Sequence, residues 1–377
     1  MRTKAIIHLD RFRDNLCAVQ KRVGPQRKIC VPVKADAYGH GALQIARASL
    51  QAGVFCLAVA AVEEGKELRG GGIKAPILLL SQAHPEETSA LVKASLSPVV
   101  SDIDYVNRLN AEAAASGVKL QVHLKIDTGM GRMGTRPEDA AGFARHISSC
   151  PALEYAGTAT HFAVSESSAA DDVAYTRRQI DLFMEAIASI RALGIDTGII
   201  HAANSGAVLL YPEAWLDMVR PGILLYGYKQ AQEAGPQAMS ITPVMELRSC
   251  VSFIKKVKKG ESLSYGRTWI AGADTIAAVL PIGYADGLPR SASNKWQVII
   301  GGRSYPLAGR ICMDMCLVDL GPDAQVNLWD EAVIFGGGNA AASPLVPSAA
   351  DLAERVGSIP YEITCNISKR VPREYKE

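Results

Sequence analysis

The chain has 377 residues, of which 48% are hydrophobic and 21% charged, and its 40 basic and 38 acidic side chains leave a net charge of +2. This length and apolar fraction suit two domains, or one barrel with an appended domain, and exclude a disordered or collagen-like chain. A nearly neutral charge without a basic block is untypical of proteins that bind nucleic acid or an anionic membrane.

The sequence shows neither a membrane span nor an export signal. No segment approaches the roughly eighteen apolar residues needed to cross a bilayer. The apolar run after the basic tip ends at Asp10, so we expect no signal peptide. The eight cysteines are scattered and form no C-x-x-C pair. We therefore expect reduced thiols in a cytoplasmic protein.

Short apolar runs alternate with helical periodicity from residue 29 to about residue 220. The predicted strands are Ile29–Lys34, Phe55–Val59, Ile77–Leu80, Pro98–Val100, Leu120–Ile126, Leu153–Thr160, Gly198–His201 and Asp217–Arg220. The clearest predicted helix is Val173–Leu193, which Gly194 ends. Ser101 and Asp104 indicate the start of another helix. Strands alternating with helices in this way predict an α/β fold with a closed (β/α)8 barrel, and an open doubly wound sheet is the alternative.

The pattern changes after about Ser240, where short stretches alternate apolar with polar residues. These stretches are Met245–Phe253, Thr275–Pro281, Gln297–Gly301, Cys316–Leu320 and Ala332–Phe335. They predict a second, mainly β domain, with Met245–Phe253 as one half-exposed strand. We place the barrel at 1–235 and the β domain at 236–377, with residues 1–9 as a candidate extra strand of the β domain. The linker is expected within 230–242, and 336–344 reads as a loop without a phosphate-cradling P-loop ending.

Lys34 ends the first predicted strand, and a lysine there has two interpretations. Burying an unpaired ammonium is costly, so its amine could extend along the apolar surface to solvent. Alternatively, it could be a desolvated amine with a depressed pKa, able to form a Schiff base.

Barrel enzymes place their chemistry at the carboxyl ends of the strands, and these ends carry a distinctive set of residues. They are Lys34, Tyr38, Lys125, Arg132, His161, Asn204, Ser205, Arg220, Gly222 and Ile223. A hydroxyl at Ser205 and main-chain N–H groups after the last strand can hold a phosphate. An amine facing a phosphate cradle is what a pyridoxal phosphate enzyme requires.

Each of these residues also has a structural interpretation when taken alone. Ser205 could cap a helix, His161 could be a hydrogen-bonded core histidine, and Lys125 could extend to solvent. Arg220 could form an ion pair with Asp217 or Asp286. Their shared position on one face of the predicted barrel favours function.

The stretch 129–134 matches G-x-G-x-x-G and follows a strand, so a dinucleotide site is a rival interpretation. It lies at the fifth predicted strand, however, and residues 135–137 separate it from the next helix. Arg132 would also crowd the close approach of a pyrophosphate. The seven histidines show neither H-E-x-x-H nor paired-cysteine spacing, so we expect no metal.

Seven motifs, in one order along the chain, resemble those of the alanine racemase family. They are VKADAYGHG at 33–41, KIDTGMGRMG at 125–134, THF at 160–162, RPGI at 220–223, SYGRTW at 264–269, IGYADG at 282–287 and GRICMD at 309–314. The similarity extends to Tyr361 and Glu362. The resemblance implies a fold-type III pyridoxal 5'-phosphate enzyme, a barrel followed by a β domain, acting as a head-to-tail homodimer with shared active sites.

The resemblance also assigns roles to residues. Lys34 would carry the cofactor and act as one acid–base group, and Tyr265 of the partner subunit would act on the opposite face of the substrate. Arg220 would face the pyridine nitrogen, and with His161 it would activate Tyr265. The cofactor phosphate would be held by Tyr38, Ser205, Gly222, Ile223 and Tyr361, with Asn204 also at the cofactor. The substrate carboxylate would be bound by Arg132 and the Met313 N–H, and Lys125 is a candidate for carbamylation.

The expected activity is therefore interconversion of L- and D-alanine, which supplies D-alanine for peptidoglycan. Serine or broad-specificity racemases share most of the motifs and remain the alternative, although the bulk of Tyr361 favours alanine. A decarboxylase of basic amino acids shares the two-domain plan, but it would use a carboxylate where Arg220 stands. A non-enzymatic pyridoxal phosphate carrier would be a single barrel, so the SYGRTW motif in a β domain argues against it.

Overall fold

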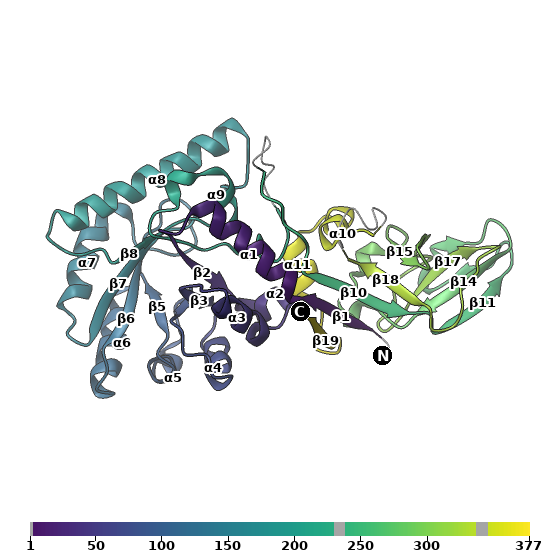
Figure 1. Cartoon of the computed structure of the whole chain (residues 1–377), viewed down its shortest axis with the longest axis horizontal. Helices are drawn as coiled ribbons and strands as arrows, with labels where there is room; N and C mark the ends of the chain where they lie inside the picture. The colour runs from purple at the N-terminus through teal and green to yellow at the C-terminus, as the bar shows by residue number, and fades with distance from the viewer. Residues whose placement is uncertain (1–2, 230–237, 337–345) are drawn as a thin grey trace.

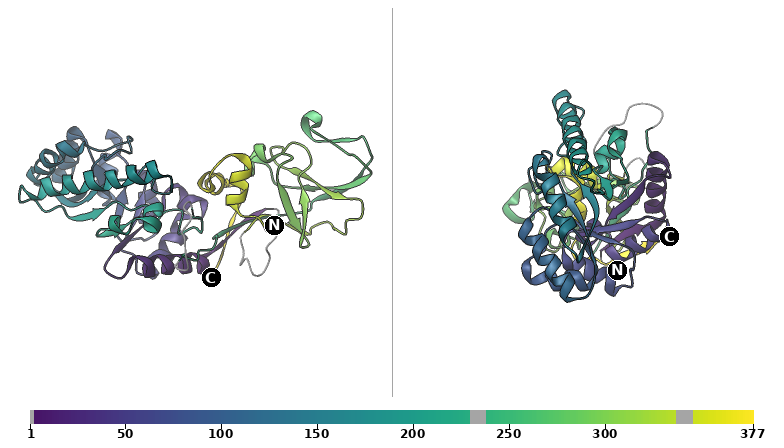
Figure 2. Two further views of the ribbon diagram at one scale, coloured as in Figure 1. Left: turned by 90° about the horizontal axis from the view of Figure 1, so that it is seen from above. Right: turned by 90° about the vertical axis from the view of Figure 1, so that its left-hand side faces the viewer.

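The protein folds as two bodies that lie end to end, as Figure 1 shows. This computed structural model describes residues 3–229, 238–336 and 346–377. A barrel with its helices forms one body, and a β-rich body forms the other, seen again from above in Figure 2. The boundary predicted between residues 235 and 236 lies within 230–237, outside the described residues, as do residues 337–344 of the predicted loop.

The first body is a closed barrel of eight parallel strands, β2 to β9. They are β2 Lys28–Pro32, β3 Cys56–Val59, β4 Ile77–Leu79, β5 Ser97–Val100, β6 Leu120–Lys125, β7 Leu153–Ala159, β8 Ile199–His201 and β9 Met218–Val219. Closure is made by β9 against β2, where Lys28 is paired with Met218 and Ile29 with Val219. This closure confirms the predicted barrel. The prediction was possible because strands covered on both faces are continuous apolar runs, which are easy to recognise in a sequence.

Helices surround this barrel, as the view from its end in Figure 2 shows. They are α1 Leu9–Val23, α3 Ala42–Gln51, α4 Val62–Gly70, α5 Thr88–Lys93, α6 Ile103–Ala115, α7 Ala140–Ser149, α8 Ala170–Arg191 and α9 Ser205–Leu210. The predicted long helix is confirmed as α8, with Ile180, Phe183 and Ile187 on its buried face. The residue that caps α6 is Asp102 rather than the predicted Ser101, since its carboxylate accepts from the Tyr105 N–H at 2.7 Å.

The second body contains sheets of six, three and two strands, ordered β16-β15-β18-β10-β1-β19, β11-β14-β17 and β12-β13. The strands are β1 Lys4–His8, β10 Met245–Cys250, β11 Phe253–Val257, β12 Ser262–Leu263, β13 Trp269–Ile270, β14 Thr275–Leu280, β15 Gln297–Ile300, β16 Arg303–Pro306, β17 Cys316–Gly321, β18 Glu331–Phe335 and β19 Arg373–Lys376. Two short helices, α10 Ala349–Val356 and α11 Pro360–Cys365, complete it. The mainly β domain is confirmed.

The predicted strand Met245–Phe253 is corrected by the structure, because it divides into β10 and β11, which lie in different sheets. β10 is also more buried than a half-exposed strand, since its polar residues Glu246 and Ser249 are both only 5% exposed. The Glu246 carboxylate forms an ion pair there with Arg11 at 3.0 Å and lies 3.0 Å from His8 Nε2. Glu246 and Ser249 therefore contact other side chains, Arg11 and Thr3 among them, instead of water.

Both ends of the chain enter the same sheet. β1 pairs antiparallel with β10 and parallel with β19. The extra strand predicted within residues 1–9 is therefore present, and it spans Lys4–His8. Figure 1 shows the carboxyl end of the described chain near the junction of the bodies. Of the helices within 3–229, 238–336 and 346–377, none is long and apolar enough to cross a membrane.

Candidate active site

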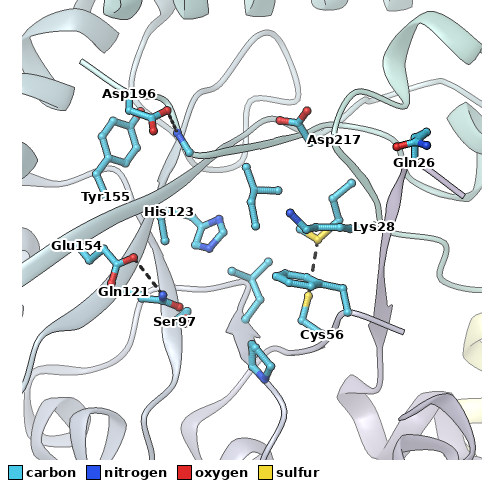
Figure 3. A pocket seen from close by; sticks show the side chains of 17 residues that line it. Gln26, Lys28, Cys56, Ser97, Gln121, His123, Glu154, Tyr155, Asp196 and Asp217 are labelled. Atoms are coloured by element: carbon cyan, nitrogen blue, oxygen red, sulfur yellow. Dashed lines mark hydrogen bonds between the residues drawn. The ribbon is translucent and has the colours of Figure 1, made fainter. Parts of the chain in front are cut away.

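A cavity of about 380 Å³ opens where the barrel strands end, and it collects most of the predicted site residues. These are Lys34, Tyr38, Lys125, Arg132, His161, Asn204, Ser205, Arg220, Gly222 and Tyr361. A second hollow of about 620 Å³ lies at the opposite end of the barrel and is drawn in Figure 3. None of the predicted site residues lines that second hollow.

Lys34 begins a left-handed helical turn rather than ending a strand, which corrects the predicted strand end. β2 stops at Pro32, and Ala35, Asp36, Ala37 and Tyr38 all have φ between 52° and 54°. For residues with a Cβ this conformation costs about 1–2 kcal/mol each, so tertiary contacts must maintain it. The turn directs Lys34 and Tyr38 to the same cavity.

Carboxylates fix both ends of this turn. Glu64, from the first turn of α4, accepts from the Ala35 N–H at 2.6 Å. At the other end, the Asp36 carboxylate accepts from the Ala42 N–H at 2.7 Å and so caps α3. These hydrogen bonds join the turn to the two helices that follow it in the chain.

The C-terminal segment closes over the same turn. Arg373 donates from Nε to the Gly39 carbonyl at 3.0 Å. Gly39 and Gly41 have φ of 82° and 95°, and a Cβ at either would collide with Thr364 O or with the Tyr375 hydroxyl. Glycine is required there both for the backbone angle and for the close approach of the last residues.

The environment of Lys34 favours a neutral amine. Burial lowers the pKa of Lys34, and the positive charge of Arg132 lowers it further. Glu64 acts in the opposite direction but does not reverse the net effect. A lysine with a depressed pKa is a nucleophile near neutral pH, which supports the Schiff-base interpretation.

Hydroxyl groups converge beside Gly222. Ser205 Oγ accepts from the Gly222 and Leu224 N–H groups at 2.9 and 3.3 Å, so its own proton points elsewhere. A Cβ at Gly222 would lie 3.0 Å from the Tyr38 hydroxyl and 3.8 Å from Ser205 Oγ. Burial raises the pKa of Tyr38, which therefore remains a donor. The Tyr38 and Ser205 hydroxyls can therefore both donate to an anion beside Gly222, which leaves the space between them free of a side chain. We call this group of donors the donor cradle.

Asn204, not Ser205, caps α9. Its Oδ1 accepts from the Ala207 N–H at 3.0 Å and from the Ser165 hydroxyl at 2.7 Å. The capping interpretation of Ser205 is thus wrong. The Ile223 side chain is fully buried, so any contact of this residue with a ligand must come from its main chain.

Arg220 is buried without an acidic partner among the described residues. It donates from Nη1 to His201 Nδ1 at 2.6 Å and from Nη2 to Thr160 O at 2.8 Å, and His161 Nδ1 lies 3.3 Å from Nη2. Burial lowers the pKa of Arg220 to about 10, so it stays charged near neutral pH. The ion-pair interpretation is wrong, because Asp217 binds the Ile200 N–H and Asp286 pairs with Arg370.

Two further basic residues line the cavity close to Arg220. Lys125 is 8% exposed, and burial together with the charges of Arg220 and Arg132 lowers its pKa well below the usual value. Burial and the same arginines also keep the pKa of His161 low. The surroundings of Lys125 and His161 therefore disfavour the charged form of both side chains.

The loop after β6 is not a dinucleotide motif. The Asp127 carboxylate accepts from the Gly129 and Gly131 N–H groups, both at 3.0 Å, and Thr135 returns to pair with Ile126. The glycines thus serve a tight loop that brings Arg132 to the cavity, and α7 begins later, at Ala140.

Tyr265 and Met313 do not line the cavity of their own chain. They belong to the β-rich body, where Tyr265 is 69% and Met313 is 53% exposed. Tyr265 begins a 3₁₀ turn after Ser264, whose φ is 62°. The structure therefore separates these two residues from the other predicted site residues within one chain.

Sequence reasoning missed two residues that shape the site. His201, the nearest partner of Arg220, is the last residue of a predicted strand, and that position was the available signal. Glu64 had no comparable signal, because its contact with Ala35 spans 29 positions and depends on the left-handed turn.

Comparison with known proteins identifies two family domains. The family described as "Alanine racemase, N-terminal domain" matches residues 7–230, and "Alanine racemase, C-terminal domain" matches residues 244–375. The alanine racemase of Treponema denticola is 49% identical over 98% of this chain and 97% of its own length. That of Treponema pallidum is 44% identical, over 99% and 98%.

Solved structures agree with the sequence comparison. An alanine racemase of Clostridium difficile 630 superposes with a TM-score of 0.93 at 34% identity, covering 100% of this chain and 96% of that one. The alanine racemase of Bacillus anthracis with bound L-Ala-P gives a TM-score of 0.91 at 30% identity, with 100% and 95% covered. With both domains matched over nearly the whole chain and the strand-end cavity in place, this protein belongs to the alanine racemase family.

Proposed function

We propose that the protein is a pyridoxal phosphate-dependent racemase that interconverts L- and D-alanine. The observation that carries the proposal is the cavity, where a lysine with a depressed pKa, a donor cradle beside Gly222 and a buried arginine meet. Family membership from residue 7 to residue 375 supports the same reaction. Alanine racemases use pyridoxal 5'-phosphate.

The residues of the cavity fit this cofactor. Lys34 would bond its aldehyde carbon, and the hydroxyls of Tyr38 and Ser205 would hold its phosphate beside Gly222 and the main chain of Ile223. Tyr361, which packs on Tyr38 with ring centroids 5.6 Å apart, would cover the phosphate side, and Asn204 would border it. When bound, the cofactor withdraws electron density from the amino acid and makes its Cα proton acidic.

Racemisation needs a proton carrier on each face of the substrate, and of the two residues proposed for this role, Lys34 and Tyr265, one chain places only Lys34 in its cavity. Lys34 Nζ would take or return the Cα proton on one face. Tyr265 of the partner subunit would do so on the other, which requires a head-to-tail homodimer. The large exposure of Tyr265 and Met313 in a single chain supports such an arrangement.

Arg220 is proposed to face the pyridine nitrogen. A guanidinium donates but does not readily release its proton, so the ring would remain a weaker electron sink than one paired with a carboxylate. This favours simple proton transfer over transamination. It also argues against a basic amino-acid decarboxylase, because no carboxylate of the described residues is within ion-pair distance of Arg220.

Arg132, with the main-chain N–H of Met313 from the partner subunit, would bind the substrate carboxylate. Lys125 lies among positive charges with a depressed pKa, and its neutral amine could react with carbon dioxide. The resulting carbamate would be an anion able to orient Arg132. We further propose that the reaction supplies D-alanine for peptidoglycan in the cytoplasm.

One incubation tests the proposed reaction. The holoenzyme is mixed with L-alanine in deuterated water, with L-serine and L-lysine in parallel, and chirality and Cα deuterium are followed together. We expect deuterated D-alanine to form faster than either other substrate reacts. Faster conversion of serine would indicate a broad-specificity racemase instead of one that prefers alanine. Decarboxylation of lysine would overturn the racemase proposal.

A further inference from the structure

A hydrogen-bonded row of side chains crosses the barrel from the active-site cavity to the hollow at its other end. Arg220 Nη1 lies 2.6 Å from His201 Nδ1, and His201 Nε2 lies 3.0 Å from His123 Nδ1. Arg220 and His201 line the active-site cavity, whereas His123 lines the hollow of Figure 3. The three residues come from the neighbourhood of β9, from β8 and from β6, so the row spans the barrel interior.

The proton positions along this row follow from one constraint. Arginine has only donors, so His201 Nδ1 must accept and its proton must sit on Nε2. That Nε2–H donates to His123 Nδ1, which leaves the second proton of the row on His123 Nε2. Both rings are neutral, because burial and the Arg220 charge lower the pKa of His201 and bring that of His123 to about 4.

Gly157 leaves open the space that the His123 ring occupies. A Cβ at Gly157 on the neighbouring strand would collide with His123 Nδ1, so a glycine there admits the ring. His123 is 6% exposed and meets His201 edge to face, with centroids 5.1 Å apart at 73°. Figure 3 shows the His123 ring among the side chains that line the hollow.

We propose that His123 is a positioning residue that acts through His201 to hold Arg220 in its orientation toward the cofactor. The inference rests on the proposed role of Arg220 at the pyridine nitrogen. No carboxylate among the described residues pairs with the Arg220 guanidinium, and the side chains that contact it there are the neutral acceptors His201 and His161.

Removing His123 would change what His201 offers to Arg220. Without the acceptor at His123 Nδ1, the His201 Nε2–H becomes a buried donor without a partner, which is costly. The ring is then free to adopt the other tautomer, whose Nδ1–H points at a guanidinium N–H. Arg220 would lose its shortest hydrogen bond and its fixed position.

The test uses two variants that differ in a single property. His123→Leu removes the hydrogen-bond acceptor of His201. His123→Asn keeps an acceptor, because its amide oxygen can lie near the former position of Nδ1. His146→Asn is the matched control, since His146 is partly exposed on α7 and its ring Nε2 lies 2.8 Å from Asn107 Oδ1, outside the barrel row. Urea unfolding of all three verifies that each variant folds.

The first readout is independent of cofactor and turnover. Two-dimensional ¹⁵N NMR of the histidine-labelled apoprotein reports which ring nitrogen of His201 carries the proton. We expect Nε2–H in the wild type, in His123→Asn and in His146→Asn, and a mixture of tautomers in His123→Leu. A wild-type His201 protonated on Nδ1, or a His201 spectrum unchanged by His123→Leu, would overturn the relay.

The second readout is made on the holoenzymes with L-alanine. We expect kcat of His123→Leu to fall by roughly tenfold or more, as for an unpaired buried donor, with KM little changed and with recovery in His123→Asn. Unchanged kcat in a folded His123→Leu would refute the positioning role. A wild type that does not racemise alanine would instead refute the proposed function, and the NMR comparison would still decide whether His123 sets the tautomer of His201.

Discussion

The Ala35 N–H lies 2.6 Å from Glu64 Oε1, so the residue after Lys34 is held by a carboxylate from α4. The other oxygen of Glu64 accepts from the Ala60 and Ala61 N–H groups at 2.7 and 3.1 Å. One side chain therefore ties the start of the left-handed turn to the connection between β3 and α4. The conformation of the lysine turn depends on an element that sequence reasoning did not associate with it.

We expect Glu64→Ala to destabilise the protein by about 1–2 kcal/mol and to weaken cofactor binding, because three main-chain donors lose a charged acceptor. Glu64→Gln keeps one oxygen and should lose less. Urea unfolding and cofactor titration measure the two effects. The control is Glu63→Ala, since the Glu63 side chain is 64% exposed and pairs with Lys66 at 3.6 Å. If Glu63→Ala and Glu64→Ala lost the same amount of stability and cofactor affinity, the proposed role of Glu64 would be contradicted.

Lys34→Ala should abolish the visible absorbance of the lysine-bound cofactor, because no other amine in the cavity is proposed to bond it. Absorption spectra of the purified variant with added cofactor provide the measurement. The matched control is Lys66→Ala on the outer face of α4, where the side chain is 52% exposed. A band that survives unchanged in Lys34→Ala would show that the Schiff-base assignment is wrong.

Tyr265→Ala should keep cofactor binding but lose Cα exchange from the L-enantiomer preferentially, since each base serves one face. Tyr265→Phe retains the ring and removes only the hydroxyl, so it separates proton transfer from subunit contact. Single-turnover exchange in deuterated water, run from each enantiomer, measures the effect. Equal losses from both enantiomers in Tyr265→Phe would contradict the division between the two bases.

Lys125 should carry a carbamate when carbon dioxide is present, because burial and two nearby arginines lower its pKa and so favour the free amine. Incubation with ¹³C-bicarbonate should give a carbamate carbonyl signal by NMR. Lys125→Arg, which has no reactive amine, should lack that signal. If both proteins give the same spectrum, the proposed modification is refuted.

Stability should fall on acidification between about pH 6.5 and pH 4. Burial lowers the pKa of His40 and of His123 to about 4, against an unfolded value near 6.5. The unfolded chain therefore binds more protons in this range, so the free energy of unfolding decreases as pH falls.

Urea midpoints across this range measure the dependence on pH, and His123→Asn should flatten it. His84→Gln serves as the control, because the His84 side chain is 66% exposed. A wild-type midpoint that stays constant from pH 6.5 to pH 4 would contradict the expected loss.

The barrel was predictable because each of its strands is a short apolar run with helical periodicity between it and the next. The left-handed turn was not predictable. Gly39 and Gly41 signal a break, but Ala35 and Tyr38 disfavour positive φ by their own propensities. Contacts from Glu64 and from the C-terminal segment impose the turn, and such distant contacts leave no local pattern.

Much of the site followed from one geometric rule, that barrel chemistry gathers at the carboxyl ends of strands. This rule brought Lys34, Lys125 and Arg220 together correctly. The rule did not point to His123, because His123 faces the other end of the barrel. The alternation of apolar and polar residues also did not show that β10 and β11 are separate strands, because it carries no information on which sheet each segment joins.

The contact between β19 and the lysine turn joins segments that lie far apart in the sequence. Arg373 donates to the Gly39 carbonyl across 334 positions, and Thr364 and Tyr375 enclose the same turn. Closing so long a loop costs entropy before the contact can form, so contacts of this kind form late in folding. We therefore expect the barrel strands to form first and Lys34 to stay solvated until β19 pairs with β1, which would make cofactor capture a late step of maturation.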